Sequence, residues 1–161
     1  MKFEHLIEIN DILNPLSETI SREQLWRGLV LRAEMPKLFV PYIDEADISE
    51  RTEVSMKRTL KYGTLSITDT VSLVHLEHVH YHVAAQGDIA QSSLQMRIEE
   101  PQPEHLFVRF LYDDGGPEVE SDEAKMYNSY RRSAYQEADI DTIRTIRELV
   151  ESGQLDTTRL N

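Results

Sequence analysis

The chain contains no cysteine among its 161 residues. Disulfide bonds and thiolate chemistry are therefore excluded, and a cytoplasmic setting is the default expectation. No apolar run approaches the ~20 residues that a membrane-spanning helix needs. The first residues also lack the basic-then-apolar order of a signal peptide, so we expect no insertion into a membrane.

Basic residues are few: 17 lysines and arginines stand against 29 aspartates and glutamates, which gives a formal net charge of −12. Such a chain repels phosphates, which excludes nucleic acids and anionic membrane surfaces as partners. Glycine-rich phosphate loops, nucleophile elbows and His-Glu-x-x-His motifs are also missing. The sequence therefore contains no motif that indicates a cofactor, a metal or a catalytic residue. The hydrophobic content of 40% suits a single domain, residues 1–161, with a substantial core.

The hydrophobic pattern changes period along the chain. Residues 3–9 alternate and predict a half-buried strand whose inner face includes His5. Ser21, followed by glutamine three residues later, predicts a capped helix that ends near Pro36. From residue 44 to residue 112 the period is two, which predicts consecutive strands. The last segment, residues 121–153, predicts one long helix or two helices end to end.

The stretch around Gly63 predicts a hairpin with a two-residue turn. Counting outward pairs Leu60 with Ile67 on an apolar face, while the opposite face is wholly polar. One pair breaks the apolar face, because Arg58 comes to lie opposite Asp69. Extending the count through the longer loops predicts a row across the covered face of the sheet: Arg58, Asp69, Tyr81, Met96 and Val108.

The inward Arg58–Asp69 pair has two interpretations. It is a structural ion pair, retained although desolvation costs several kcal/mol per ion, or it orients a polar group of a ligand. A cavity would let it do both. His5 is more often a satisfied core histidine than a general base. Four histidines lie between residues 75 and 82, and their polar strand face favours solvated surface histidines over a metal site.

On a helical wheel the long helix carries small residues and tyrosines on one face: Ala124, Tyr127, Tyr130, Ala134 and Ala138. Such a face either covers a cavity, with the tyrosines adding polar tips, or packs closely as an ordinary core helix. The polar row on the sheet favours the cavity. Beyond Ala138 the apolar positions drift around the wheel, which predicts a kink or break between Ala138 and Asp141.

Several short stretches resemble the AtaL-like subfamily of the START and birch-pollen-allergen superfamily (SRPBCC). These stretches are Phe3-Glu4-His5, Asn14-Pro15-Leu16, residues 24–29, Arg109-Phe110 and residues 134–141. The resemblance implies an α+β helix-grip fold, in which a curved antiparallel sheet of six to seven strands wraps around the long C-terminal helix. It also implies a largely apolar pocket. Superfamily members bind lipids, sterols or polyketides, and some branches are cyclases or aromatases.

We therefore expect a protein that binds a hydrophobic small molecule with a polar or anionic group. The residues expected to contact the ligand are His5, Arg58, Asp69, Tyr81, Met96, Tyr127 and Tyr130. One alternative is a cyclase-like enzyme in which Arg58 stabilises an enolate and Asp69 or His5 acts as base, although the ion pair disfavours Asp69 in that role. A third class, an interaction module without a ligand, predicts a pocket filled by side chains.

Overall fold

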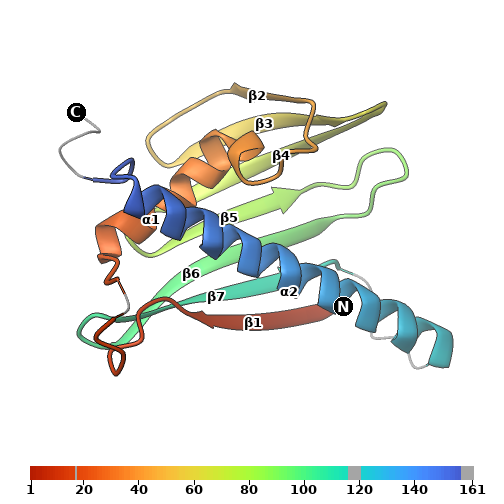
Figure 1. Cartoon of the computed structure of the whole chain (residues 1–161). Helices are drawn as coiled ribbons and strands as arrows, with labels where there is room; N and C mark the ends of the chain where they lie inside the picture. The colour runs from red at the N-terminus through yellow and green to blue at the C-terminus, as the bar shows by residue number, and fades with distance from the viewer. Residues whose placement is uncertain (17, 116–120, 157–161) are drawn as a thin grey trace.

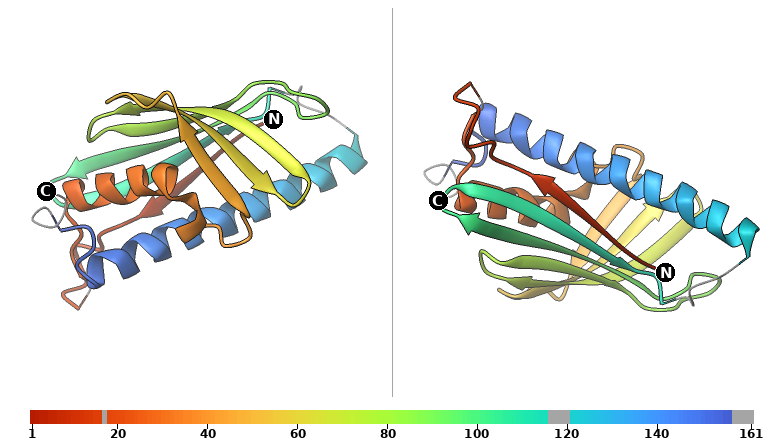
Figure 2. Two further views of the ribbon diagram at one scale, coloured as in Figure 1. Left: turned by 90° about the horizontal axis from the view of Figure 1, so that it is seen from above. Right: turned by 90° about the horizontal axis from the view of Figure 1, so that it is seen from below.

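The computed structural model describes residues 1–16, 18–115 and 121–156. Seven antiparallel strands form one curved sheet in the order β1-β7-β6-β5-β4-β3-β2, and both helices lie on its concave side (Figure 1, Figure 2). The predicted helix-grip fold is thereby confirmed. In chain order the elements are β1 (Lys2–Glu8), α1 (Arg22–Glu34), the 3₁₀ turn η1 (Pro36–Leu38), β2 (Glu45–Ser49), β3 (Ser55–Tyr62), β4 (Leu65–Val74), β5 (His78–Val83), β6 (Ser92–Gln102), β7 (His105–Asp113) and α2 (Asp122–Glu151).

The helix ends follow the predicted capping residues. The Ser21 hydroxyl accepts a hydrogen bond from the Gln24 amide, and the Gln24 side chain accepts one from the Ser21 amide. This reciprocal capping box satisfies two backbone donors at the start of α1. Ser121 caps α2 through the amide of Ala124, 3.2 Å away. Local hydrogen bonding thus sets where both helices begin.

The β3–β4 hairpin has the predicted register, with Arg58 opposite Asp69 and Gly63 in the turn at a φ of +61°. Beyond this hairpin the predicted pairs are wrong by two residues. Tyr81 lies opposite Val71 and Leu94 rather than Asp69 and Met96. Because side chains alternate with a period of two, a two-residue error leaves every residue on its correct face and escapes the hydrophobic pattern.

The predicted row is therefore wrong in its last members as well. Met96 lies opposite Val79 and Phe110, not opposite Tyr81 and Val108. The connections after β5 and β6 set these registers; the first spans residues 84–91, and the second consists of Pro103 and Glu104. The β6–β7 ladder also contains an irregularity between Glu99 and Gln102. Bulges of this kind change the count without any signal in hydrophobicity.

The predicted break in α2 is also wrong, since one helix runs from Asp122 to Glu151. The inner face continues through the suspected region because Asp139 and Thr142, both buried, take inward positions. The predicted inner face was rotated away from this one. Tyr127 and Tyr130 are 66% and 77% exposed, and Ala134 and Ala138 are exposed too. The polarity of the true inner residues hid the helical stripe from a hydrophobic wheel.

The core fills the space between the concave face and the two helices, and α1 contacts α2 at Gly28. A β-carbon added at Gly28 would lie 2.9 Å from the side chain of Ile146, which is fully buried on α2. Glycine is required here by helix–helix distance rather than by backbone conformation. Within the described part of the chain, no helix is both long and apolar enough to cross a membrane.

Replacing Gly28 by alanine is expected to destabilise the protein, because the added methyl overpacks a stiff β-branched side chain at a cost of about 1–3 kcal/mol. The better helix propensity of alanine, worth about 1 kcal/mol, offsets part of that loss. Urea unfolding followed by circular dichroism measures the change. In an Ile146→Ala background the same substitution is expected to cost less; equal costs in both backgrounds would contradict the steric explanation.

Candidate functional site

A cavity of about 370 Å³ lies between the concave face of the sheet and the two helices. This volume falls in the lower part of the range for small-molecule sites, about 300–1,000 Å³. Apolar side chains and a compact polar group share its wall. The lining residues are Met1, Arg32, Arg58, Leu60, Tyr62, Ile67, Asp69, Tyr81, Val83, Ser92, Ser93, Leu94, Tyr112, Asp113, Asp114 and Tyr135.

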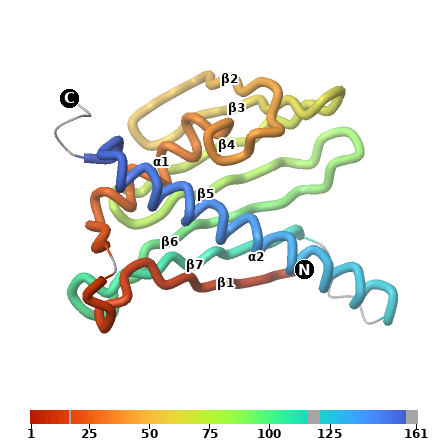
Figure 3. The backbone as a smooth tube through the Cα atoms, in the orientation of Figure 1, coloured from red at the N-terminus to blue at the C-terminus, as the bar shows by residue number. Residues whose placement is uncertain are grey.

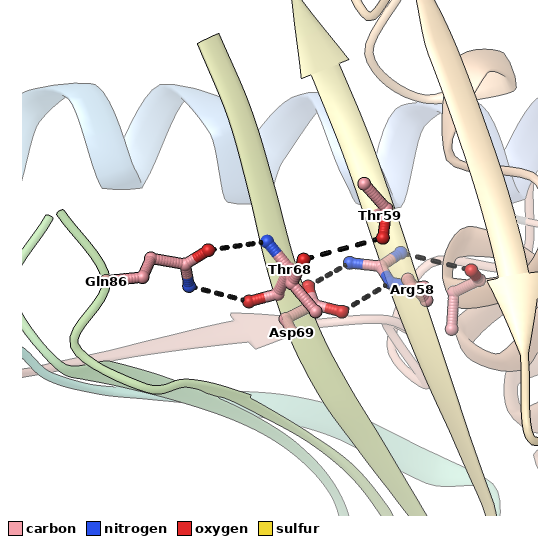
Figure 4. Close-up of polar contacts among 6 residues, drawn as sticks. Arg58, Thr59, Thr68, Asp69 and Gln86 are labelled. Atoms are coloured by element: carbon pink, nitrogen blue, oxygen red, sulfur yellow. Dashed lines mark hydrogen bonds and ion pairs between the residues drawn. The ribbon is translucent and has the colours of Figure 1, made fainter.

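Arg58 and Asp69 form a bidentate ion pair across the β3–β4 hairpin (Figure 4). Nε donates to Oδ1 over 2.9 Å and Nη2 to Oδ2 over 2.6 Å, and the two residues are only 4% and 5% exposed. Nη1 of Arg58 donates to the carbonyl of Ala33 in the last turn of α1, at 3.0 Å. The pair therefore fastens the hairpin to the free carbonyl end of a helix.

The outer part of β4 lacks a strand partner on the side of β5, because the β4–β5 ladder runs only from Val74 to Thr70. Figure 3 shows the β3–β4 hairpin and the β5–β6 hairpin diverging at this end of the sheet. The side-chain amide of Gln86 fills the place of a strand at Thr68. It accepts from the Thr68 amide at 3.0 Å and donates to the Thr68 carbonyl at 2.9 Å (Figure 4). This satisfies the β4 backbone beside the cavity.

Tyr81 lies within reach of two arginines. Its ring centroid is 5.0 Å from Cζ of Arg58 and 5.2 Å from Cζ of Arg32. The residue is 5% exposed, and its hydroxyl has no hydrogen-bond partner among the residues that the structure describes. Leaving a buried hydroxyl unsatisfied costs about 1–3 kcal/mol. An unsatisfied group on a cavity wall is an available contact for a ligand.

Arg32 was missed at the level of sequence. It lies in the last turn of α1, three residues after the buried Leu29, so it shares the inward stripe of that helix. Its Nε donates to Oγ1 of Thr142 on α2 at 3.2 Å. A cation on an otherwise apolar helical stripe is the signal that marks it, by the same logic that drew attention to Arg58.

A second polar cluster lies beside the cavity, around Asp139 on α2. Its Oδ1 accepts a hydrogen bond from the Tyr112 hydroxyl, and its Oδ2 lies 3.2 Å from Nδ1 of His5. Burial raises the pKa of Asp139 to about 6, although the hydrogen bonds with Tyr112 and His5 act in the opposite direction. Burial, with the nearby Asp139 charge, also raises the pKa of Tyr112. The inward orientation of His5 was predicted, whereas its partner Asp139 and the Tyr112 hydroxyl bound to Asp139 were not.

The helix contributes Tyr135 to the cavity, not the tyrosines expected from the wheel. The Tyr135 ring stacks on Tyr112 at a centroid distance of 4.1 Å and an interplanar angle of 9°. Its hydroxyl accepts a hydrogen bond from Nη2 of Arg131 at 3.0 Å. This stacked pair forms one side of the space that Tyr127 and Tyr130 were expected to close.

The structure thus brings together three of the seven predicted contact residues, Arg58, Asp69 and Tyr81, on the cavity wall. Their binding role stays a prediction. Met96 is fully buried in the core and contributes nothing to the wall. His5 lies outside the lining, and the exposed Tyr127 and Tyr130 point away from it. Within the described ranges, no three histidine or acidic side chains are grouped as metal ligands.

This fold and cavity define a helix-grip protein of the SRPBCC superfamily. The chain belongs to the AtaL family, described as acetylaranotin biosynthesis cluster protein L, whose profile matches residues 7–153. No curated protein matches the sequence.

Solved structures with low sequence identity share the fold. The di-domain ARO/CYC protein StfQ from the steffimycin biosynthetic pathway has a TM-score of 0.68 and 9% identity, over 95% of this chain and 52% of that one. The chain therefore spans about half of StfQ. The Zhui aromatase/cyclase from Streptomyces sp. R1128 has a TM-score of 0.63 and 14% identity, over 93% of this chain and 95% of that one. Ara h 8.0201 has a TM-score of 0.57 and 12% identity, over 94% of this chain and 98% of that one. These structures share the fold of this chain.

Truncating one member of the buried ion pair is expected to be costly. Arg58→Met leaves the Asp69 carboxylate buried and unpaired, and should lower the free energy of unfolding by about 3–5 kcal/mol. The double variant Arg58→Met/Asp69→Leu should recover most of that loss, which urea unfolding measures. Lys61→Met, which breaks the exposed Lys61–Glu45 pair on the same strand, serves as control and should change stability by less than about 1 kcal/mol. Equal losses in the single and double variants would contradict this account.

The raised pKa of Asp139 predicts a pH-dependent stability. The folded state holds this proton more tightly than the unfolded state, so the stabilisation is complete below about pH 4 and is lost as pH rises through about 6. Relative to Asp139→Asn, the wild type should therefore lose roughly 3 kcal/mol between these limits. Urea unfolding at a series of pH values measures the difference. The exposed neighbour variant Asp141→Asn should show no such trend; a constant difference for Asp139→Asn would exclude the shift.

Proposed function

We propose that the protein binds a hydrophobic small molecule, with a polar or anionic group, in the cavity between the sheet and the two helices. The observation that carries the proposal is the cavity together with Tyr81, a residue of its lining whose buried hydroxyl has no partner among the described residues. A bound ligand that hydrogen-bonds to this hydroxyl removes the penalty of leaving it unsatisfied. Apolar side chains nearby, such as Leu60, Ile67 and Leu94, suit the remainder of such a ligand.

The aromatic side chains favour a planar ligand. Tyr62, Tyr81, Tyr112 and Tyr135 all contribute to the wall, and aromatic rings prefer offset-stacked or edge-to-face contacts with other rings. A space of about 370 Å³ that persists between packed layers also speaks against the third class, the interaction module with a collapsed pocket. The similarity in fold to aromatase/cyclases and to Ara h 8.0201 supports the same function.

An enzymatic function in the same cavity is the second candidate, and the Asp139 cluster favours it. Tyr112 lines the cavity and hydrogen-bonds to Asp139, whose pKa of about 6 suits proton transfer near neutrality. The originally expected bases are less suitable, because Arg58 holds both oxygens of Asp69 and His5 lies outside the lining. For a cyclase-like reaction, we infer that Tyr112 and Asp139 would carry the proton.

Binding is tested by filling the cavity from β4. Ile67 lines the wall, so Ile67→Trp is expected to weaken binding of the neutral fluorescent probe N-phenyl-1-naphthylamine at least tenfold, because the indole occupies the ligand's space. Ser66→Trp adds the same ring to the opposite, exposed face of the strand and should leave binding unchanged. Native mass spectrometry of protein from its own host would show whether a small molecule co-purifies with the wild type alone. Failure of the wild type to bind any apolar probe would overturn the proposal.

A further inference from the structure

We propose that Arg32 and the Tyr81 hydroxyl together form an anion-binding subsite that receives the acidic group of the ligand. This inference rests on the proposed function and deepens it, because it names the ligand as an organic acid whose carboxylate or other oxyanion lies against α1. It also transfers the role of charged anchor from Arg58, the residue expected from the sequence, to Arg32.

Arg58 is poorly suited to bind a further anion. Three of its N–H donors are used, two by the carboxylate of Asp69 and one by the carbonyl of Ala33. Its charge is balanced by a carboxylate at hydrogen-bond distance, and the two residues are almost fully buried. A ligand anion placed here would meet Asp69 at close range and would be repelled. Arg58 therefore belongs to the scaffold of the site.

Arg32 has the opposite character. Nε is held by Oγ1 of Thr142, and that hydroxyl donates in turn to the carbonyl of Ala138 at 3.0 Å, so α2 fixes the orientation of the guanidinium. Across residues 1–16, 18–115 and 121–156 the two terminal nitrogens of Arg32 have no hydrogen bond or ion pair. A half-buried guanidinium with its fork of donors unused matches a planar carboxylate.

The two buried carboxylates near this position have other partners. Asp69 is held by Arg58, and Asp139 is held by Tyr112 and His5. No ion pair joins either carboxylate to Arg32 in the described part of the chain. One positive charge on the cavity wall is thus left without a counter-ion at contact distance. A ligand anion would supply this counter-ion.

Tyr81 completes the subsite. Arg32 and Arg58 both approach its ring within about 5 Å, so two guanidinium groups surround a phenol whose hydroxyl is buried and unpartnered. Arg32 and Tyr81 both line the cavity, so a guanidinium fork and a hydroxyl are together available as N–H and O–H donors to an oxyanion. A neutral ligand of the same shape would use the hydroxyl alone. The arrangement therefore selects for charge.

A matched pair of probes tests this selectivity. 8-Anilinonaphthalene-1-sulfonate carries an anionic group that N-phenyl-1-naphthylamine lacks on the same ring system. In fluorescence titrations of the full chain, Arg32→Gln is expected to weaken binding of the sulfonate about tenfold or more and to leave binding of the neutral probe within about twofold. Arg32→Lys keeps the charge and should retain part of the preference. Tyr81→Phe should weaken binding of the sulfonate severalfold and should have little effect on binding of the neutral probe.

Arg144→Gln is the control, since it removes the same charge from an exposed position on α2 that lies outside the cavity lining. It should leave both affinities unchanged, and an equal loss in this variant would assign the effect to net charge. An unchanged ratio of the two affinities in Arg32→Gln, or an equal loss of both, would overturn the subsite. If Arg32→Gln does not fold, Tyr81→Phe and Arg32→Lys decide by the same ratio. A wild type that binds the neutral probe but not the sulfonate contradicts the subsite alone, whereas one that binds neither contradicts the proposed function as well.

Discussion

The buried bidentate pair between Arg58 and Asp69 is the interaction on which the geometry of the cavity depends. Two charges taken out of water are tolerated only with good geometry and further hydrogen bonds. Both conditions hold here, because the third contact of Arg58 reaches the last turn of α1 at Ala33. The pair therefore sets the distance between the β3–β4 hairpin and α1, and with it the width of the space beneath them.

Polar residues on the concave face divide it into two regions with different properties. Towards one end the helices pack closely, with Gly28 against Ile146, and the interior is apolar and filled. Towards the other end, Arg32, Tyr81 and Tyr112 face a space that side chains leave open. Apolar surfaces close on one another readily, whereas charged and hydroxyl groups resist burial without partners. The same layers thus supply both a stable core and an open cavity.

The two polar clusters around the cavity differ in what they can do. Arg32 presents unused donors and favours recognition of an anion, while Asp139 holds a proton near neutral pH behind Tyr112. Binding needs only the first cluster, and catalysis would also need the second.

Sequence patterns by themselves determined the properties that depend on neighbours along the chain. Ser21 and Ser121 cap helices through amides three residues away, and the two-residue turn at Gly63 set the pairing of Arg58 with Asp69. In each case the partners are brought together by a short, stiff connection, so counting residues is sufficient. The resemblance of short stretches to a known family made it possible to predict the helix-grip fold as well.

Tertiary structure alone decided the longer-range relations. The position of Tyr81 depends on loops that shift register by two residues without changing any face, so no pattern records it. The inner face of α2 contains Asp139 and Thr142, whose polarity contradicts burial until partners from β1, β7 and α1 are in place. Whether a polar side chain is satisfied or left free on a cavity wall depends on atoms far apart in sequence. For that reason Arg32, unremarkable in the sequence, became the residue most suited to meet an anion.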